Sequence, residues 1–158
     1  MQKTTIDGVT IELSAPVDVP EATIRPDSRI YNADAAAVTV TFRNETGQPL
    51  SAPLEEIGNG LVLVYAVAGR GDPIVDNAIP PPPQDGSVIT LAPDASHVVR
   101  MSFRYPESLM PPRIQEPVVV KFCVRWRQEW LRTKNYRPGI VNWNKSFEVC
   151  ADVRILRD

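Results

Sequence analysis

The sequence predicts an all-β fold, namely a two-sheet antiparallel sandwich of about seven to eight short strands with a long C-terminal hairpin. Two observations carry this prediction. Apolar residues recur at every second position in several short segments, and this period is typical of half-buried strands. The chain also contains 16 prolines in 158 residues. This is about twice the average frequency of roughly 5%, which disfavours long helices.

The most specific prediction concerns the hairpin, whose strands are residues 117–127 and 146–156. Placing Cys123 opposite Cys150 makes one face apolar and pairs opposite charges across the other, which stabilises neighbouring strands. A slip of one residue would lose both features, so the register is well specified. The charged pairs are Lys121 with Asp152 and Arg125 with Glu148, and the apolar pairs are Val124 with Val149, Phe122 with Ala151, Val120 with Val153 and Trp126 with Phe147.

The other elements follow from the same patterns. Alternation predicts strands at residues 8–13, 37–43, 87–91 and 97–105, and a continuous apolar run predicts a central strand at 61–67. Residues 54–57 are expected to form one helical turn and 92–95 a turn. The proline-containing segment 14–31 is expected to follow a sheet edge, pairing around 22–25, and 69–86 to be loop. We expect one β-sandwich domain over residues 1–158.

Three features resemble bacterial immunoglobulin-like domains. They are the strand count, the run Val-Thr-Phe-Arg-Asn44 followed by a turn, and the run Ile89-Thr-Leu-Ala-Pro-Asp94 leading into an alternating strand. The resemblance implies an immunoglobulin-like sandwich and implies no functional residue. The chain differs from antibody domains in having no cysteine on its second predicted strand.

The two cysteines bear on both structure and location. Cys123 and Cys150 lie on the polar side of the hairpin, although unpaired cysteine is usually buried. A disulfide explains this, because facing residues at a non-hydrogen-bonded position have Cα atoms about 4.5 Å apart. The alternative is that another element covers this face and both thiols are ordinary core residues. A bridge predicts an oxidising compartment, and hence a periplasmic or secreted protein whose leader has been removed. A cytoplasmic protein is the alternative.

Residues typical of catalytic and metal sites are scarce. His97 is the single histidine, and the chain has no serine-nucleophile motif, phosphate-binding glycine loop or His/Cys cluster. Asp72 and Asp76 are too few to hold calcium, which takes about six to eight oxygen ligands. The tripeptide Arg70-Gly71-Asp72 matches an integrin-recognition motif but is short enough to occur by chance. We therefore expect no enzyme, no cofactor and no metal.

The tip of the hairpin is the predicted binding site. Continuing the register places Trp130 opposite Trp143. A strand reaching Trp130 would be about 40 Å long and would project beyond the sandwich. The segment is rich in Trp, Tyr and Arg, which dominate interface hot spots. The alternative is that the tryptophans cap the open end of the core. The predicted binding residues are Trp130, Arg132, Lys134, Tyr136, Arg137 and Trp143.

These features predict a non-enzymatic module that binds another protein, one with an acidic or concave surface. An inhibitor or immunity protein of an exported bacterial enzyme would be one instance. The alternative is a glycan-binding or polyanion-binding module, in which tryptophans stack and arginines pair with acidic groups. The net charge of −2 gives no reason to expect nucleic acid as a partner. No run of about 20 apolar residues is present, so no transmembrane segment is expected.

Overall fold

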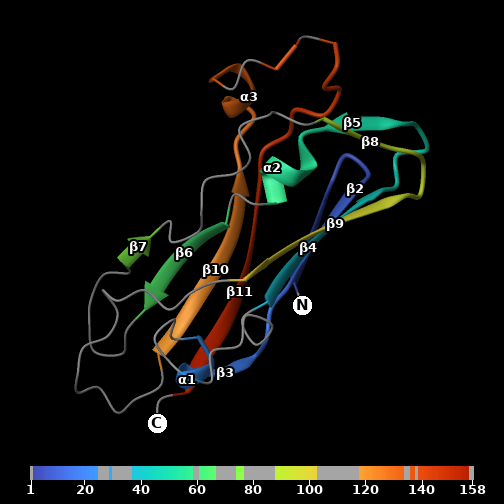
Figure 1. Ribbon diagram of the computed structural model, residues 1–158. Helices are drawn as coiled ribbons and strands as arrows, with labels where there is room; N and C mark the ends of the chain where they lie inside the picture. The colour runs from blue at the N-terminus through green and yellow to red at the C-terminus, as the bar shows by residue number, and fades with distance from the viewer. Residues whose placement is uncertain are drawn as a thin grey trace.

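The computed structural model describes residues 2–24, 29, 37–58, 61–66, 74–76, 88–102, 118–133, 136–137 and 139–156. These residues form eleven strands and three short helices (Figure 1). The all-β prediction is confirmed, and the strands outnumber the seven or eight expected. The strands are β1 (Gln2–Ile6), β2 (Val9–Ser14), β3 (Asp18–Pro20), β4 (Ala37–Asn44), β5 (Leu50–Ala52), β6 (Leu61–Ala66), β7 (Ile74–Asp76), β8 (Ile89–Leu91), β9 (Ser96–Ser102), β10 (Val118–Trp126) and β11 (Phe147–Leu156). The helices are α1 (Glu21–Ile24), α2 (Leu54–Gly58) and α3 (Trp130–Thr133).

The strands form two main sheets and one small ribbon. The first sheet has the order β1-β2-β4-β9, the second has the order β3-β11-β10-β6-β7, and β5 pairs with β8. All pairs are antiparallel except β3 with β11. The predicted strands at 8–13, 37–43 and 87–91 correspond to β2, β4 and β8. Residues 96–102 form β9, and the rest of the segment predicted to reach residue 105 lies outside the described residues.

The first sheet buries one face, because alternate residues of its strands are apolar. The buried side chains include Val9, Ile11 and Leu13 of β2, Val38, Val40 and Phe42 of β4, and Val99 and Met101 of β9. Its first strand, β1, was not predicted. Asp7 and Gly8 join β1 to β2 with φ angles of 47° and 80°, and an Asp-Gly pair with two positive φ angles is typical of a tight hairpin turn.

The second sheet contains the predicted hairpin in the predicted register. Nine facing pairs join β10 to β11, and they include Cys123 with Cys150. β6 has a neighbouring strand on each side, β10 and β7. The prediction that residues 61–67 form an interior strand of a sheet is therefore confirmed for residues 61–66. The prediction of loop throughout residues 69–86 is wrong at 74–76, where Ile-Val-Asp pairs with β6 as β7. Two of these three residues are β-branched, which favours an extended strand.

One edge of the second sheet is formed by β3, which lies parallel to the end of β11. The prediction that residues 14–31 follow a sheet edge is therefore confirmed for residues 18–20. The predicted pairing around 22–25 is wrong, because Glu21–Ile24 forms the helical turn α1. Pro20 ends the strand because it has no N–H to donate to a ladder. Arg154 reinforces the contact: its N–H donates to the Val17 carbonyl at 2.9 Å and its guanidinium donates to both oxygens of Asp18 at 2.7 and 3.1 Å.

The pair of hydrogen bonds from Arg154 predicts a measurable shift in the titration of the Asp18 carboxyl at the sheet edge. The hydrogen bond from Arg154, supported by its charge, lowers the pKa of Asp18 from the ordinary value of 3.8. A carboxyl with a lowered pKa stabilises the fold at pH values above its unfolded pKa. That contribution is lost as the pH falls through the lower folded pKa. We expect an NMR titration to place the Asp18 midpoint below 3.8 and the Arg154→Gln variant to raise it. Equal midpoints in the two proteins would exclude the interaction. The pair is exposed, so its effect on stability should be small.

The two main sheets bury their apolar faces against each other. Phe42 of β4 lies edge-on to Phe147 of β11, with ring centroids 6.4 Å apart, and residues of both sheets belong to one buried cluster. The predicted helical turn at 54–57 is confirmed as α2, which contacts β9 of the first sheet and β10 of the second. A Cβ atom at Gly58 would lie 2.7 Å from the Val99 side chain, so only glycine fits this close approach. α2 thus covers the core at one end.

Candidate functional site: the tip of the hairpin

The tip segment is defined here as residues 127–146, which connect β10 to β11. β10 ends at Trp126, and the next residues turn through three backbone bonds between residues three positions apart. These bonds are Trp130 N–H to Arg127 O at 3.0 Å, Leu131 N–H to Gln128 O at 3.1 Å and Arg132 N–H to Glu129 O at 3.2 Å. The expectation that the strand continues to Trp130 is therefore wrong. The described part of the ladder ends at Trp126 and Phe147, and α3 begins at Trp130.

The three tryptophans make separate ring contacts. Trp126 packs edge-on against Trp130, with centroids 5.5 Å apart and planes at 85°. Trp143 stacks on Phe147, with centroids 6.1 Å apart and planes at 16°. Trp126 and Trp143 are only 2% and 4% exposed, whereas Trp130 is half-buried against the core. The predicted facing of Trp130 and Trp143 is wrong, because the chain leaves the ladder before reaching Trp130. Trp126 and Trp143 cap the core, as the alternative interpretation held.

The returning part of the tip segment is fastened to the body of the sandwich. The Asn142 carboxamide accepts a bond from Ser51 N–H at 2.6 Å and donates to the Pro49 carbonyl at 3.3 Å. The Asn142 N–H donates to the Ser51 carbonyl at 3.2 Å. Lys145 forms an ion pair with Asp7 at 3.0 Å. Figure 1 shows α3, α2, β5 and β8 gathered at the same end of the molecule. These contacts fix the base of the tip segment in position.

A further hydrogen bond joins the two ends of the tip segment. The Gln128 N–H donates to the Ser146 hydroxyl at 2.9 Å, which joins the first residues of the tip segment to its last. The sequence gives no local signal for this bond or for the contacts of Asn142 and Lys145, because each joins residues far apart in the chain. The predicted set of site residues therefore missed the residues that hold the tip in place.

Three exposed arginines of the tip segment form no ion pair within the part of the chain that the structure describes, whereas Lys145 pairs with Asp7. Arg127, Arg132 and Arg137 are all exposed and have no carboxylate partner among those residues. Glu129 is the exposed acidic residue of the same segment. Lys134, which was predicted to bind, lies outside the described residues. Ile140 adds an apolar side chain that is 44% exposed.

Tyr136 differs from the arginines because its ring is half-buried. Its hydroxyl is buried and, among the described residues, accepts or donates no hydrogen bond. The Trp143 indole N–H is likewise buried and unpaired in that part of the chain. Unpaired buried polar atoms are uncommon and cost free energy. The tip segment thus buries Trp143 in the same core as Trp126 of β10 and carries exposed arginines.

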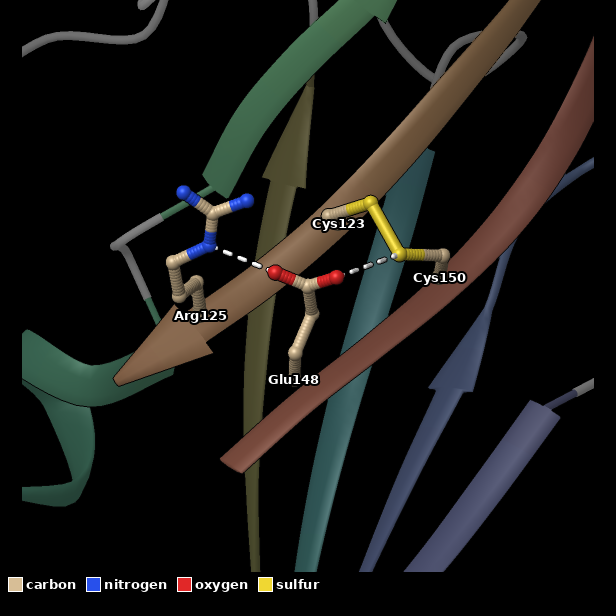
Figure 2. Close-up of a disulfide and its surroundings, with 4 residues drawn as sticks. All are labelled: Cys123, Arg125, Glu148 and Cys150. Atoms are coloured by element: carbon tan, nitrogen blue, oxygen red, sulfur yellow. Dashed lines mark hydrogen bonds and ion pairs between the residues drawn. A yellow bond between two sulfur atoms is a disulfide. The ribbon is translucent and has the colours of Figure 1, made fainter. Parts of the chain in front are cut away.

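The disulfide lies on the outer face of the same hairpin (Figure 2). Cys123 and Cys150 are bonded to each other, with their Cα atoms 4.0 Å apart, so the predicted bridge is confirmed. Cys123 is 3% exposed, and Cys150 is half-buried. Beside them, Arg125 Nε donates to Glu148 Oε2 at 2.5 Å, as the predicted charge pairing requires. The bridge therefore joins two strands that backbone pairing and the Arg125–Glu148 ion pair also hold in register; Lys121 and Asp152 face each other as predicted but form no ion pair with each other.

The described residues offer few groups for catalysis. His97 Nε2 lies 2.6 Å from Glu55 Oε1, and this pair joins β9 to α2. The tripeptide Arg70-Gly71-Asp72 lies outside the described residues, and the side chain of Asp76 is also not described. The one group of possible metal-ligating residues in the described part of the chain is Cys123, Glu148 and Cys150, and its two sulfur atoms are bonded to each other.

Comparisons with known proteins give no family for this chain. No family model matches it, and neither a curated protein nor a solved structure matches it. Among the described residues, no helix has both the length and the apolar character needed to cross a membrane.

Proposed function

We propose that this chain is a non-enzymatic interaction module that binds another protein through its tip segment. One observation carries the proposal. The tip segment presents exposed arginines without ion-pair partners among the described residues, on a backbone held at its base by Asn142, Lys145 and Ser146. A surface that is already ordered loses less entropy when it binds, and arginine is enriched among residues that dominate binding energy.

The partner would carry an acidic surface. Arg127, Arg132 and Arg137 form no ion pair with a described carboxylate, so each can pair with a carboxylate of the partner through charge-assisted hydrogen bonds. Because the tip segment follows the last ladder pair at one end of the sandwich (Figure 1), it could enter a concave surface. An inhibitor or immunity protein that enters the cleft of an exported bacterial enzyme would use these features.

Burial of the tryptophans favours a protein partner over a glycan. Sugars and bases stack on exposed aromatic faces, and Trp126 and Trp143 are nearly fully buried. Trp130 is half-buried, and its ring also packs against Trp126. The arginines alone would support binding of a polyanion, so the salt dependence of binding distinguishes the two classes. A polyanion complex should weaken steeply with salt.

We also propose an immunoglobulin-like arrangement for the strands. In such domains one sheet contains strands A, B and E, and the other contains G, F, C and C′. Without the edge strands β1 and β3 and the ribbon β5-β8, the sheet orders are β2-β4-β9 and β11-β10-β6-β7, and these match the two sets when the remaining strands are lettered in chain order. The tip segment then corresponds to the connection between F and G. The disulfide supports a periplasmic or secreted location, where such bonds persist.

The proposal predicts that charge removal at the tip weakens binding without unfolding the protein. Arg132→Ala combined with Arg137→Ala should weaken partner binding at least tenfold, a loss of about 1.4 kcal/mol. The melting temperature should stay within a few degrees, because both side chains are exposed and unpaired within the described region. The partner would be isolated from the source organism with the wild-type protein, and its dissociation constant would then be measured by calorimetry.

The matched control is Lys3→Ala combined with Lys121→Ala. Both lysines are exposed and lie in strands β1 and β10 rather than in the tip segment, so the control removes the same charge from another place. We expect it to bind like the wild type. If the arginine variant binds as tightly as the wild type, or if both variants bind equally weakly, the tip segment is not the binding site.

A further inference from the structure

The outer face of the hairpin places three potential metal ligands together. The sulfur atoms of Cys123 and Cys150 and a carboxylate oxygen of Glu148 all lie within 4.8 Å of one another. The cysteines face each other across the ladder, and Glu148 precedes Cys150 by two residues, so it lies on the same face of β11. Figure 2 shows the carboxylate directed between Arg125 and the bridge.

We propose that, when the disulfide is reduced, Cys123, Cys150 and Glu148 bind one thiophilic divalent cation such as Zn²⁺. Cysteine thiolates are soft ligands that select zinc over calcium and magnesium. Three protein ligands leave the fourth tetrahedral position to water, as in open zinc sites. This proposal is independent of the function proposed for the tip segment.

The chemistry involves two separate steps. A dithiol reductant supplies two electrons and two protons, the Sγ–Sγ bond breaks, and the reductant leaves as its own disulfide. Binding of the cation then displaces both thiol protons into solvent, and a lone pair from each sulfur forms a bond to the metal. Because both states use the same two sulfur atoms, the bridge and the bound cation exclude each other.

The ladder keeps the reduced thiols close together. The register of β10 and β11 is held by backbone pairing over nine residue pairs and by the ion pair of Arg125 with Glu148, so it does not depend on the bridge. The cation can approach from the exposed Glu148 and the half-buried Cys150, while Cys123 supplies a buried ligand. A site that is largely formed beforehand binds its ligand with a smaller entropic cost.

The two oxygens of Glu148 have different neighbours. Oε2 accepts the hydrogen bond from Arg125 Nε, whereas Oε1 lies 3.8 Å from Cys150 Sγ. Oε1 is therefore the oxygen placed to bind a cation held by the sulfurs. Arg125 would remain on the other oxygen and orient the carboxylate, as residues behind metal ligands commonly do.

The test uses the full chain, reduced and then separated from the reductant without oxygen. Zinc affinity is measured by competition with a chromophoric chelator, and circular dichroism of each sample reports the fold. We expect one zinc ion per reduced chain and none for the oxidised protein or for Cys123→Ser combined with Cys150→Ser. Glu148→Gln should weaken zinc binding by about tenfold or more, since loss of even a partner behind a metal ligand typically costs about 10- to 100-fold in affinity.

Asp152→Asn is the matched control for the carboxylate. Asp152 follows Cys150 by two residues, is exposed, and lies on the same face opposite Lys121, but it lies outside the ligand cluster. It should bind zinc like the wild type. Absence of zinc binding by the reduced protein, or equal binding by the oxidised protein, would overturn the proposal. Equal zinc affinities of Glu148→Gln and Asp152→Asn would also overturn it. That result would be expected if reduction unfolded the chain and zinc bound the two thiolates without the fold.

Discussion

Replacing Trp126 by alanine is expected to lower the free energy of unfolding by about 3 to 5 kcal/mol. Trp126 is 2% exposed and belongs to the buried cluster shared by the two sheets. Its removal would leave a cavity beside Trp130, whose ring lies edge-on to it at 5.5 Å. Both the lost apolar burial and the unfilled volume contribute to the cost. Urea denaturation at equilibrium measures the change.

Trp130→Ala is the control for this substitution. It removes the same side chain from a half-buried position in α3, so we expect a loss of less than half as much. The comparison separates the part of the tip that caps the core from the part available to a partner. Equal losses for the two variants, or a loss below about 1 kcal/mol for Trp126→Ala, would contradict the core position assigned to Trp126.

Removing the disulfide is expected to have the second-largest effect. Cys123→Ser combined with Cys150→Ser should lower the free energy of unfolding by about 3 kcal/mol, because the bridge closes a loop between residues separated by 27 positions. The cost is mainly the loop entropy that the bridge removes from the unfolded chain. For a chain of this length, about 3 kcal/mol corresponds to a decrease in Tm of roughly 6 to 12 °C.

The reduced wild-type protein is the control for the serine variant. In the absence of metal, both lack the cross-link, so their Tm values should agree within about two degrees. Calorimetry of the oxidised, reduced and serine forms gives the comparison. An oxidised protein no more stable than the other two would show that strain in the folded state offsets the loop entropy.

The hairpin was predictable because several independent signals agreed on one register. Alternating apolar residues chose the buried face, two opposite-charge pairs fitted the other face, and the cysteines faced each other. Any shift by one residue would have broken all three. The strands β2 and β4 were predictable for a similar reason, since their alternating side chains are buried in the first sheet.

The strands that were missed are short or lie at sheet edges. β1 carries two threonines and little apolar character, and its signal was the turn at Asp7 and Gly8 rather than its own pattern. β7 is three residues long within a segment dominated by glycine and proline. β3 lies on the predicted edge path, but its pairing was placed at 22–25 instead of 18–20, because its partner in β11 lies more than a hundred residues away in the chain. Composition over a window cannot detect pairing of this kind.

At the tip, the exposure of two predicted arginines agrees with the structure, whereas the path of the chain and the burial of Trp143 do not. Arg132 and Arg137 are exposed, as expected of binding residues, and Trp126 lies in the core layer. The exit from the ladder at Trp126 could not be inferred from alternation, because Trp130 also fits a period of two. The chain turns there through local hydrogen bonds and the Ser146 hydroxyl.

The order of the strands also constrains the timing of biosynthesis. Every strand that the structure describes in the first sheet precedes residue 103, whereas the second sheet needs β11, which pairs with both β10 and β3 and ends at Leu156. At typical translation rates of about 5 to 20 residues per second, the interval between these two points lasts roughly 3 to 10 seconds. During that interval the nascent chain would have all the described strands of the first sheet but not the complete partner sheet that covers its apolar face. A factor that shields this face on the ribosome, or transport of the chain before it folds, would protect the nascent protein from aggregation.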